Sequence, residues 1–439
     1  MTETSSRVIS TAAAGANSVA TADSVGEVHV VGHIERGTPV FRQASLAIFF
    51  AGFATFSLLY CVQPIMPVFS AEFKISASES SLPLSLAISV FAFAMLAASA
   101  LSEVWGRKRV MVMSVLASAF LTLLSAFSPS WDAFILLRAL IGLTLSGLPA
   151  AAMAYMSEEM NPRATGFAVG LYVGGTALGG MTGRLLGGVL TDYGSWRFTM
   201  AVVGALSILA GVGLWHRLPA SRHYRRQSSK PRHLFRFFMG HLRDPGLRWL
   251  YVEGFLVMGG FVTIYNYIGY LLIGPPYHLS QSALGAIFLT YLIGIGSSTW
   301  CGILAGRVGH RRILWIMVTA MLAGVAMTLF NKIQGVLLGL ALLTFGLFGA
   351  QSVVSSWVGL RAQYARAQAS SLYLCSYYLG SGVLGVCGGF FWSAAGWHGV
   401  VIFVISILVI ALLVSLRLAT LKLKPQELPA LECNGGSVR

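Results

Sequence analysis

The stretch SALSEVWGRKR at residues 99–109 is repeated in GILAGRVGHRR at residues 302–312, with its glycine and basic residues at similar spacing. Each copy follows a long apolar run, and the offset between the copies is 203 residues. A second alignment places residues 171–196 on residues 372–397, with an offset of 201. Two alignments with nearly equal offsets predict a duplicated unit whose two halves share one orientation.

The composition places this duplicated chain in a membrane. Of its 439 residues, 56% are hydrophobic and 10% are charged, whereas soluble domains carry about 25% charged residues. A helix needs about 20 apolar residues to cross the hydrocarbon core. Twelve apolar stretches meet this length: 45–69, 80–102, 110–128, 132–156, 165–190, 196–216, 248–273, 282–305, 312–331, 334–360, 369–395 and 397–417.

Basic residues are distributed unequally between the predicted loops. With the N-terminus inside, the inner segments hold 25 of the 30 Lys and Arg residues and the outer loops hold three. Lys and Arg favour cytoplasmic loops, so both termini are predicted to be cytoplasmic in a bacterial-type inner membrane. The formal net charge of +15 therefore reports topology, and no nucleic-acid partner is expected.

The predicted fold is an all-α membrane protein of twelve transmembrane helices, arranged as two six-helix bundles. Residues 1–44 and 419–439 are predicted cytoplasmic tails, the first of them disordered. The bundles cover residues 45–217 and 248–418, and residues 218–247 form a cytoplasmic linker. This linker is basic with phenylalanines interleaved, which favours an amphipathic segment on anionic lipid headgroups. A monomer is expected, and the sequence holds no CxxC or His/Cys cluster that predicts a metal site.

Residues 99–109 resemble the loop after the second span in the major facilitator superfamily, which reads G-x-L-a-D-r-x-G-R-[KR]. The chain departs from this pattern at Ser99, in place of Gly, and at Glu103, in place of Asp. The resemblance implies a conformational latch that holds the outward-facing state, with a basic turn on the inner face as the alternative. The candidate latch residues in the two copies are Ser99, Glu103, Gly106, Arg107, Lys108, Arg109, Gly302, Gly306, Gly309, Arg311 and Arg312.

The fifth predicted span carries a glycine face. The residues that form it are Gly175, Gly179, Gly180, Gly183 and Gly187. Four of them recur every fourth residue, a spacing that lets two helix backbones approach closely. The segment resembles the antiporter motif G-x-x-x-G-P-x-x-G-G of drug–proton exchangers, although Gly180 replaces the proline and Arg184 replaces the last glycine. The resemblance implies proton antiport, and helix packing is an equal alternative.

Ionisable residues inside spans are costly and commonly functional. Arg138 lies in a segment similar to the family's R-x-x-Q-G motif and either lines a pathway or extends to the headgroups. Arg184 and Asp192 are eight residues apart and lie on nearly the same side of the fifth predicted span, so the two side chains are candidates for an ion pair. Such a cluster would gate the outer side or attract an anionic substrate, and its alternative is a structural contact between spans four and five. Glu253 is a candidate proton-coupling carboxylate, because a low-dielectric setting favours the protonated form. Its alternative is contact with water or with a neighbouring arginine.

In the family, spans one, four, seven and ten line the central cavity. Aromatic walls with a few polar groups there suit amphipathic organic molecules. The candidate pocket residues, including two from spans eight and eleven, are Tyr60, Gln63, Tyr265, Asn266, Tyr270, Tyr291, Gln351 and Tyr377.

These features predict a secondary active transporter that moves a small organic molecule by alternating access, through proton-coupled efflux as a drug or metabolite antiporter. The sequence has no G-x-x-x-x-G-K-[ST] phosphate loop, so a proton gradient is the expected energy source and no cofactor is expected. The alternatives are proton-symport uptake of a metabolite and a non-transporting receptor on the same scaffold. An enzyme is not expected.

Overall fold

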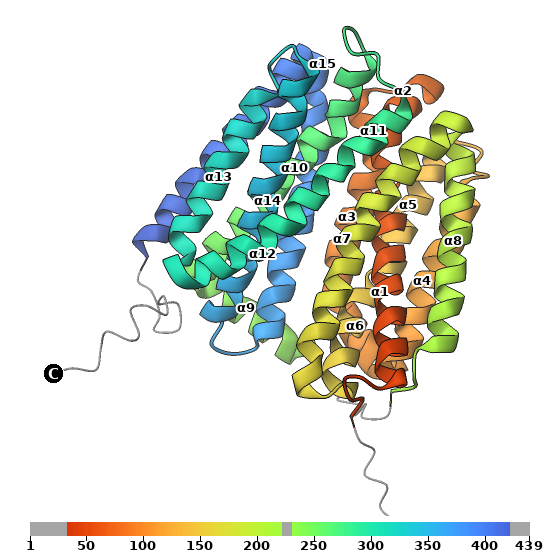
Figure 1. Ribbon diagram of the computed structural model, residues 1–439, viewed down its shortest axis with the longest axis vertical. Helices are drawn as coiled ribbons and strands as arrows, with labels where there is room; N and C mark the ends of the chain where they lie inside the picture. Colours follow the sequence, from red (N-terminus) through yellow and green to blue (C-terminus); the bar gives the residue numbers. More distant parts are fainter. Residues whose placement is uncertain (1–32, 222–230, 422–439) are drawn as a thin grey trace, which may run out of the picture. The chain divides into compact units, whose positions relative to one another are not determined.

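The computed structural model describes residues 33–221 and 231–421 (Figure 1). Residues 1–32 of the predicted N-terminal tail, residues 422–439 of the predicted C-terminal tail and residues 222–230 of the predicted linker lie outside the described residues. The prediction of a disordered tail up to residue 44 is wrong at its end, because α1 already begins at Pro39, where Thr38 caps it. The described chain from His33 onward is one compact unit.

The N-terminal half is built of helices that correspond to the first six predicted spans. Two of these spans are divided: the first into α1, η1 and α2, where Pro64 and Pro67 remove backbone donors, and the fourth into α5 and α6. The elements are α1 (Pro39–Tyr60), η1 (Gln63–Ile65), α2 (Met66–Phe73), α3 (Ala77–Trp105), α4 (Arg107–Ser125), α5 (Trp131–Leu145), α6 (Gly147–Glu159), α7 (Pro162–Tyr193) and α8 (Trp196–Arg217).

The C-terminal half repeats this order after a short helix formed by the end of the predicted linker. Its elements are α9 (Pro231–Arg243), α10 (Pro245–Ile273), α11 (Gln281–Ile287), η2 (Phe288–Thr290), α12 (Tyr291–Val308), α13 (His310–Met327), α14 (Ile333–Arg361) and α15 (Arg366–Thr420). Non-helical backbone at Ala395 and Gly396 interrupts α15, which therefore provides the last two predicted spans.

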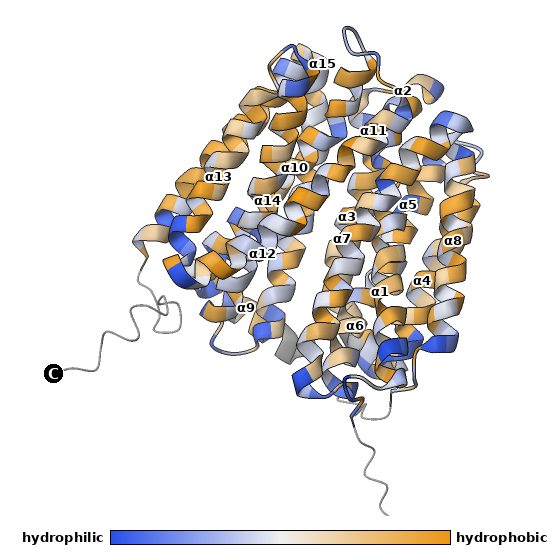
Figure 2. Cartoon of the chain, in the orientation of Figure 1, coloured by the Kyte–Doolittle hydropathy of each residue, from blue (hydrophilic) through white to orange (hydrophobic). Residues whose placement is uncertain are grey.

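Ten helical segments of the described residues are long and apolar enough to cross a membrane, and α15 is one of them. The fifth predicted span is α7, which has 32 residues but is not among the ten, because glycines and charged groups make it less apolar. With α7 included and α15 divided at its break, the helices are consistent with the twelve predicted spans. Hydrophobic residues predominate along the helices, and hydrophilic residues gather near the helix ends (Figure 2).

Local sequence explains where the helices begin. Thr38, Ser130 and Ser195 accept hydrogen bonds from the first-turn amides of α1, α5 and α8, and Ser76 forms a capping box with Glu79 at the start of α3.

The two copies of the repeated loop have the same backbone geometry. Gly106 separates α3 from α4 with φ +90°, and Gly309 separates α12 from α13 with φ +100°. A side chain at such a φ is strained, so the turn requires glycine in both halves. The repeat seen in the sequence is therefore also a repeat of backbone conformation.

The halves are joined mainly by α3 with α15 and by α7 with α11. We call the face at which α1 begins and α15 ends the terminal face, and the opposite one the far face. Within the described residues, every hydrogen bond between the halves involves side chains toward the far face, as for Gln63 with Asn266 and Ser70 with Tyr270. The halves are therefore closed against each other on the far face.

Candidate functional site

Arg184 of α7 is at the centre of the candidate site. It is 2% exposed, its Nε donates to Oε1 of Gln63 at 2.6 Å, and its Nη1 donates to the carbonyl of Gly180 at 2.8 Å. No carboxylate forms an ion pair with it within the described residues. The predicted partner is elsewhere, because Asp192 accepts from the backbone amide of Ser282 across the two halves. The proposed Arg184–Asp192 pair is therefore not formed.

Aromatic rings surround the Arg184 guanidinium. Its central carbon lies 3.9 Å from the ring centroid of Tyr60, 4.9 Å from that of Tyr291 and 5.0 Å from that of Phe288. The faces of aromatic rings attract cations, and the attraction is strongest where water is excluded. The positive charge of Arg184 is therefore contacted by aromatic rings from both halves: Tyr60 comes from the N-terminal half, and Phe288 and Tyr291 come from the C-terminal half.

Gln63 connects this arginine to the other half. Its Nε2 donates to Oδ1 of Asn266 at 2.7 Å, and Nδ2 of Asn266 is buried without a hydrogen-bond partner in the described structure. Tyr270, one turn further along α10, bonds Ser70 at 2.6 Å and Ser80 at 2.5 Å. Three of the predicted pocket residues thus form the polar seam that closes the far face.

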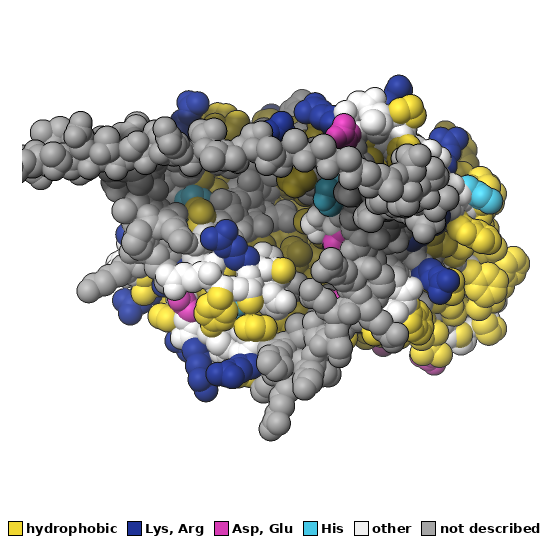
Figure 3. All heavy atoms as spheres, turned by 90° about the horizontal axis from the view of Figure 1, so that it is seen from below, with side chains coloured by type: hydrophobic (Ala, Val, Ile, Leu, Met, Phe, Trp, Pro, Cys, Tyr) yellow, Lys and Arg dark blue, Asp and Glu magenta, His cyan; other side chains and the backbone are white. Residues whose placement is uncertain are grey.

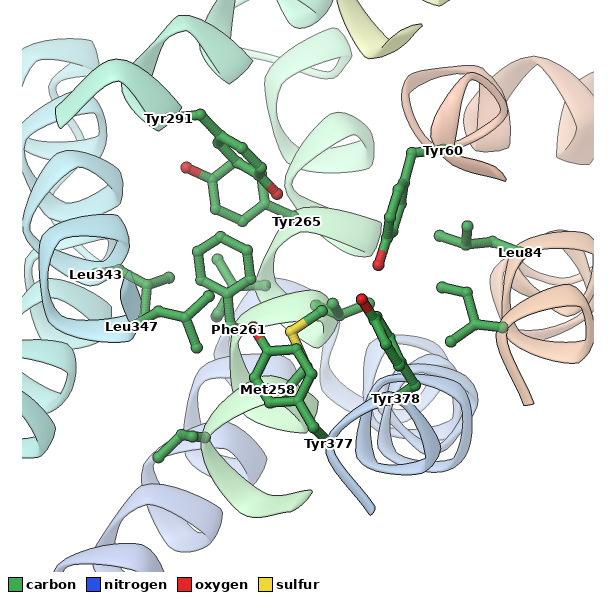
Figure 4. Packing of buried hydrophobic residues seen from close by; sticks show 14 of the residues in the cluster. Tyr60, Leu84, Met258, Phe261, Tyr265, Tyr291, Leu343, Leu347, Tyr377 and Tyr378 are labelled. Carbon is green, nitrogen blue, oxygen red and sulfur yellow. The ribbon is translucent and has the colours of Figure 1, made fainter. Parts of the chain in front are cut away.

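Other predicted pocket residues lie in the interior of the molecule, beside this seam. The Tyr265 hydroxyl is used by Thr290 and Thr344, at 2.8 and 2.7 Å, and so supports its own half. Tyr60 and Tyr378 come from opposite halves and point their hydroxyl groups toward each other, and Tyr377 lies beside Tyr378 (Figure 4). Tyr60, Tyr377 and Tyr378 are therefore buried in the middle of the molecule, where the two halves meet.

Gln351 is the predicted pocket residue that the structure leaves apart. It is half-buried on α14. Within the described residues, no hydrogen bond connects it to Arg184, Gln63 or Asn266, which we call the Arg184 cluster.

Arg138 of α5 caps a helix end. It is fully buried, and its guanidinium donates to the carbonyls of Leu58 at 2.9 Å, Leu59 at 2.5 Å and Pro83 at 3.4 Å. The last carbonyls of a helix have no partner within it, and α1 ends at Tyr60 ahead of a proline. The Arg138 side chain therefore does not extend to the lipid headgroups. It binds the end of α1, which is a structural role.

Glu253 is a buried carboxyl on α10. It is 0% exposed, and neither carboxyl oxygen has a hydrogen-bond partner in the described structure. The hydroxyl groups of Tyr251 and Tyr373 in the same half are also buried and have no hydrogen-bond partner among the residues that the structure describes. Arg248 is exposed and forms no ion pair with Glu253, so the alternative of a neighbouring arginine is not realised. Burying an unpaired charge is costly, so ionisation at this position depends on access to water.

In the loop predicted to be a latch, Arg107 pairs with an acid that the sequence did not single out. Arg107 donates to both carboxylate oxygens of Glu158 on α6, at 2.8 and 3.2 Å, and also bonds Ser102. In the other half, Arg361 pairs with Asp244 at 2.8 Å, and Arg311 donates to the carbonyl of Leu421. Glu158 lies two residues after the fourth predicted span, which ends at residue 156. Its place beside the end of a span was the one sequence feature that could have indicated it as a partner of Arg107.

Among the described residues, no side-chain hydrogen bond or ion pair joins Lys108, Arg109 and Arg312 to one another, and Glu103 is half-buried near the end of α3. Lys108 is half-buried, whereas Arg109, Arg312 and Gly306 are exposed. Gly302 approaches Ser352 on α14, where an added Cβ would lie 2.9 Å from the hydroxyl oxygen. The side chain of Ser99 lies outside the described residues.

Neutralising Glu158 tests the latch. Glu158→Gln removes the ion pair between Glu158 and the almost fully buried Arg107, and breaking a buried pair costs about 3–5 kcal/mol. Glu158 itself is 28% exposed, so the lower end of this range is expected. We expect a lower melting temperature and a several-fold loss of transport in reconstituted vesicles. Arg197→Gln, which breaks a pair exposed by 41% on each side, is the control and should change little.

The glycine face of α7 packs on α1. An added Cβ would lie 2.4 Å from Phe49 O at Gly175, 2.1 Å from Phe53 O at Gly179, 2.6 Å from Ser57 Cα at Gly183 and 2.2 Å from Cys61 O at Gly187. Gly380 of α15 approaches Phe255 O of α10 in the same way, at 2.0 Å. These stripes join helices within each half, as the packing alternative predicted. Gly180 instead faces the Arg184 guanidinium.

The alignment of residues 171–196 with residues 372–397 places the pair Gly187-Gly188 on the pair Gly388-Gly389, and the second glycine of each pair faces the other half. A Cβ at Gly188 would lie 2.4 Å from Gln281 O of α11, and a Cβ at Gly389 would lie 2.4 Å from Ser78 Cα of α3. Gly187 and Gly388, their neighbours, pack inside their own halves. The repeated glycine pair thus has one member for packing within a half and one for closing the far face.

Comparison with known proteins agrees with this architecture. The profile of the Major Facilitator Superfamily matches residues 48–365. The inner membrane transport protein YnfM of Escherichia coli (strain K12) is 48% identical over 371 residues, which cover 84% of this chain and 89% of that protein. The uncharacterized MFS-type transporter YybF of Bacillus subtilis (strain 168) is 46% identical, over 84% of this chain and 91% of that protein.

The fold is also similar to a solved structure, that of a bacterial homolog to the human lysosomal transporter Spinster in an inward-facing and unoccupied conformation. The TM-score is 0.73 at 18% identity, over 88% of this chain and 99% of that chain. Two halves with the same helix order, a repeated glycine turn and a profile match across most of the chain lead to one conclusion. This chain is a membrane transport protein that belongs to the major facilitator superfamily.

Proposed function

We propose that this chain exports a small organic molecule across the inner membrane in exchange for protons, by alternating access of its two halves, and works as a monomer. Both termini are cytoplasmic in this proposal, so the closed far face is periplasmic and the structure represents the inward-facing state. The central linker and α9 then lie against the anionic inner leaflet. Lys and Arg side chains are distributed over the terminal face, as this orientation requires (Figure 3).

The proposal of proton coupling rests on the environment of Glu253. Its carboxyl group is fully buried and lacks hydrogen-bond partners among the described residues, so a change in solvent access changes whether the charged form is tolerated. Alternating access changes solvent access in each cycle. Proton uptake and release at Glu253 can therefore follow the conformational change.

The tyrosines and Arg184 support an organic substrate between the halves. Tyr60, Tyr377 and Tyr378 offer aromatic faces and hydroxyl groups, and Arg184 offers a positive charge without an acidic partner in the described structure. Pockets for organic molecules combine apolar walls with a few polar groups in this way. A substrate that carries a negative group is favoured by Arg184.

A ligand screen followed by flux measurement tests the proposal. The purified protein is first screened by thermal shift against metabolites and antibiotics, because a bound ligand raises the melting temperature. Each stabilising compound is then loaded into proteoliposomes that contain a pH-sensitive dye. Export by exchange predicts compound movement opposite to proton movement, and accumulation of the compound when only a pH gradient is imposed.

The alternatives give different results in the same vesicles. Movement of compound and protons in one direction would identify proton-symport uptake instead. A compound that binds but never crosses the membrane would contradict transport and identify a receptor.

A further inference from the structure

A groove of about 1090 Å³ lies at the terminal face of the N-terminal half, away from the Arg184 cluster. It is formed by the end of α3, the first three turns of α4 and the segment at and after the end of α8. Trp105 from α3 and Trp215 from α8 line it and are each 57% exposed, and Met113 from α4 is 59% exposed. Large apolar side chains thus border an open groove where the spans begin.

The groove changes character along α4. Lys108 and Arg109 lie in the first turn, and Val112, Met113 and Leu116 follow toward the membrane interior. Residues four apart lie on one face of a helix, so a single strip runs from positive charge to hydrocarbon. This order matches a phospholipid, in which a phosphate is attached to acyl chains.

The charges of the groove are not balanced within it. Its lining includes Arg107, Lys108 and Arg109 and no Asp or Glu. Arg107 is held by Glu158, but Lys108 and Arg109 form no ion pair with a carboxylate in the described part of the chain. The groove therefore presents two available positive charges, which complement an anion.

The two tryptophans mark the depth of the groove. Trp is enriched at the level of the headgroups, where its ring meets apolar material and its N–H meets water. Trp105 and Trp215 line the same groove as the basic pair. The groove thus has a tryptophan from each of two helices at the level where a glycerol backbone would lie.

We propose that this groove binds one anionic phospholipid of the inner leaflet. Lys108 and Arg109 hold its phosphate, the acyl chains follow Val112, Met113 and Leu116, and Trp105 and Trp215 contact the glycerol region. Basic side chains near a membrane surface attract anionic lipids by about 1 kcal/mol each, which corresponds to roughly fivefold in affinity per residue. The site does not depend on the transported substrate or on proton coupling.

Tryptophan quenching tests the site in the full-length protein. The protein is reconstituted in vesicles that contain brominated phosphatidylglycerol or brominated phosphatidylcholine, since bromine quenches tryptophan fluorescence on contact. We expect stronger quenching by phosphatidylglycerol, and the double variant Trp105→Phe/Trp215→Phe should remove this difference. Lys108→Gln/Arg109→Gln should reduce the preference for phosphatidylglycerol by roughly 10- to 30-fold.

A matched control lies in the other half. Arg307→Gln/Arg312→Gln removes two exposed charges around the repeated loop of the C-terminal half and should leave the preference unchanged. Equal quenching by the two lipids in the unmodified protein would overturn the proposal. Loss of the difference on addition of millimolar inorganic phosphate would overturn it too, because the groove would then hold a soluble anion.

Discussion

Replacing Gly389 with leucine is expected to prevent closure of the far face. In the closed structure an added Cβ would lie 2.4 Å from Ser78 Cα, which is backbone and cannot move aside as a side chain can. Inserting groups into a packed contact costs about 1–3 kcal/mol. A bias of that size shifts a two-state equilibrium about 5- to 150-fold, here toward the state that is open on the far face.

The distance between the halves measures this shift. Spin labels at Tyr193→Cys and Phe330→Cys, both exposed near helix ends of the far face, report it in a background without the native cysteines. We expect Gly389→Leu to move the distance distribution to longer values and to reduce transport strongly. Gly188→Leu should act in the same direction, since its Cβ meets Gln281 O across the same seam.

Gly296→Leu is the matched control. Nothing lies within 4 Å of the Cβ position of Gly296, so this variant should behave as the unmodified protein does. An unchanged distance in Gly389→Leu would show that the contact with Ser78 does not limit closure of the far face.

Replacing Glu253 with glutamine is expected to abolish transport driven by a pH gradient while exchange of substrate for itself continues. Glutamine has nearly the same shape, but it does not take up or release a proton at physiological pH. The conformational change then proceeds without proton movement. Flux in proteoliposomes, with and without an imposed pH gradient, measures the two activities separately.

Stability distinguishes coupling from a structural role of Glu253. The carboxyl group has no hydrogen-bond partner within the described residues, so Glu253→Gln breaks no contact and should not lower the melting temperature. Asp132→Asn makes the same chemical change at an exposed position and should leave gradient-driven flux intact. Gradient-driven flux that survives in Glu253→Gln would place the coupling group elsewhere.

Helix positions were accessible from the sequence because each span must be long and apolar in its own right. The kink after Tyr60 followed from Pro64 and Pro67, since a proline lacks the amide donor that a helix needs. The repeated loop was also visible, because the turns at Gly106 and Gly309 require glycine. These features depend on residues close together in the chain.

The partners of the buried charges were not accessible in this way. Arg138 binds carbonyls that α1 leaves without partners at its end, and Arg184 binds Gln63, which lies 121 residues away in the chain. Backbone carbonyls carry no sequence signal, and any acid or amide near a span end was an equal candidate. The pairing of Arg107 with Glu158 escaped prediction for the same reason.

By itself, the sequence determined the spans, the duplication and the presence of a glycine face, because hydrophobic length and helical periodicity are local properties. Only the tertiary structure decided that Gly183 packs on α1 within its half while Gly188 faces the other half. Periodicity defines which residues share a face of a helix, but the neighbour on that face is set by how the helices of the two halves pack together.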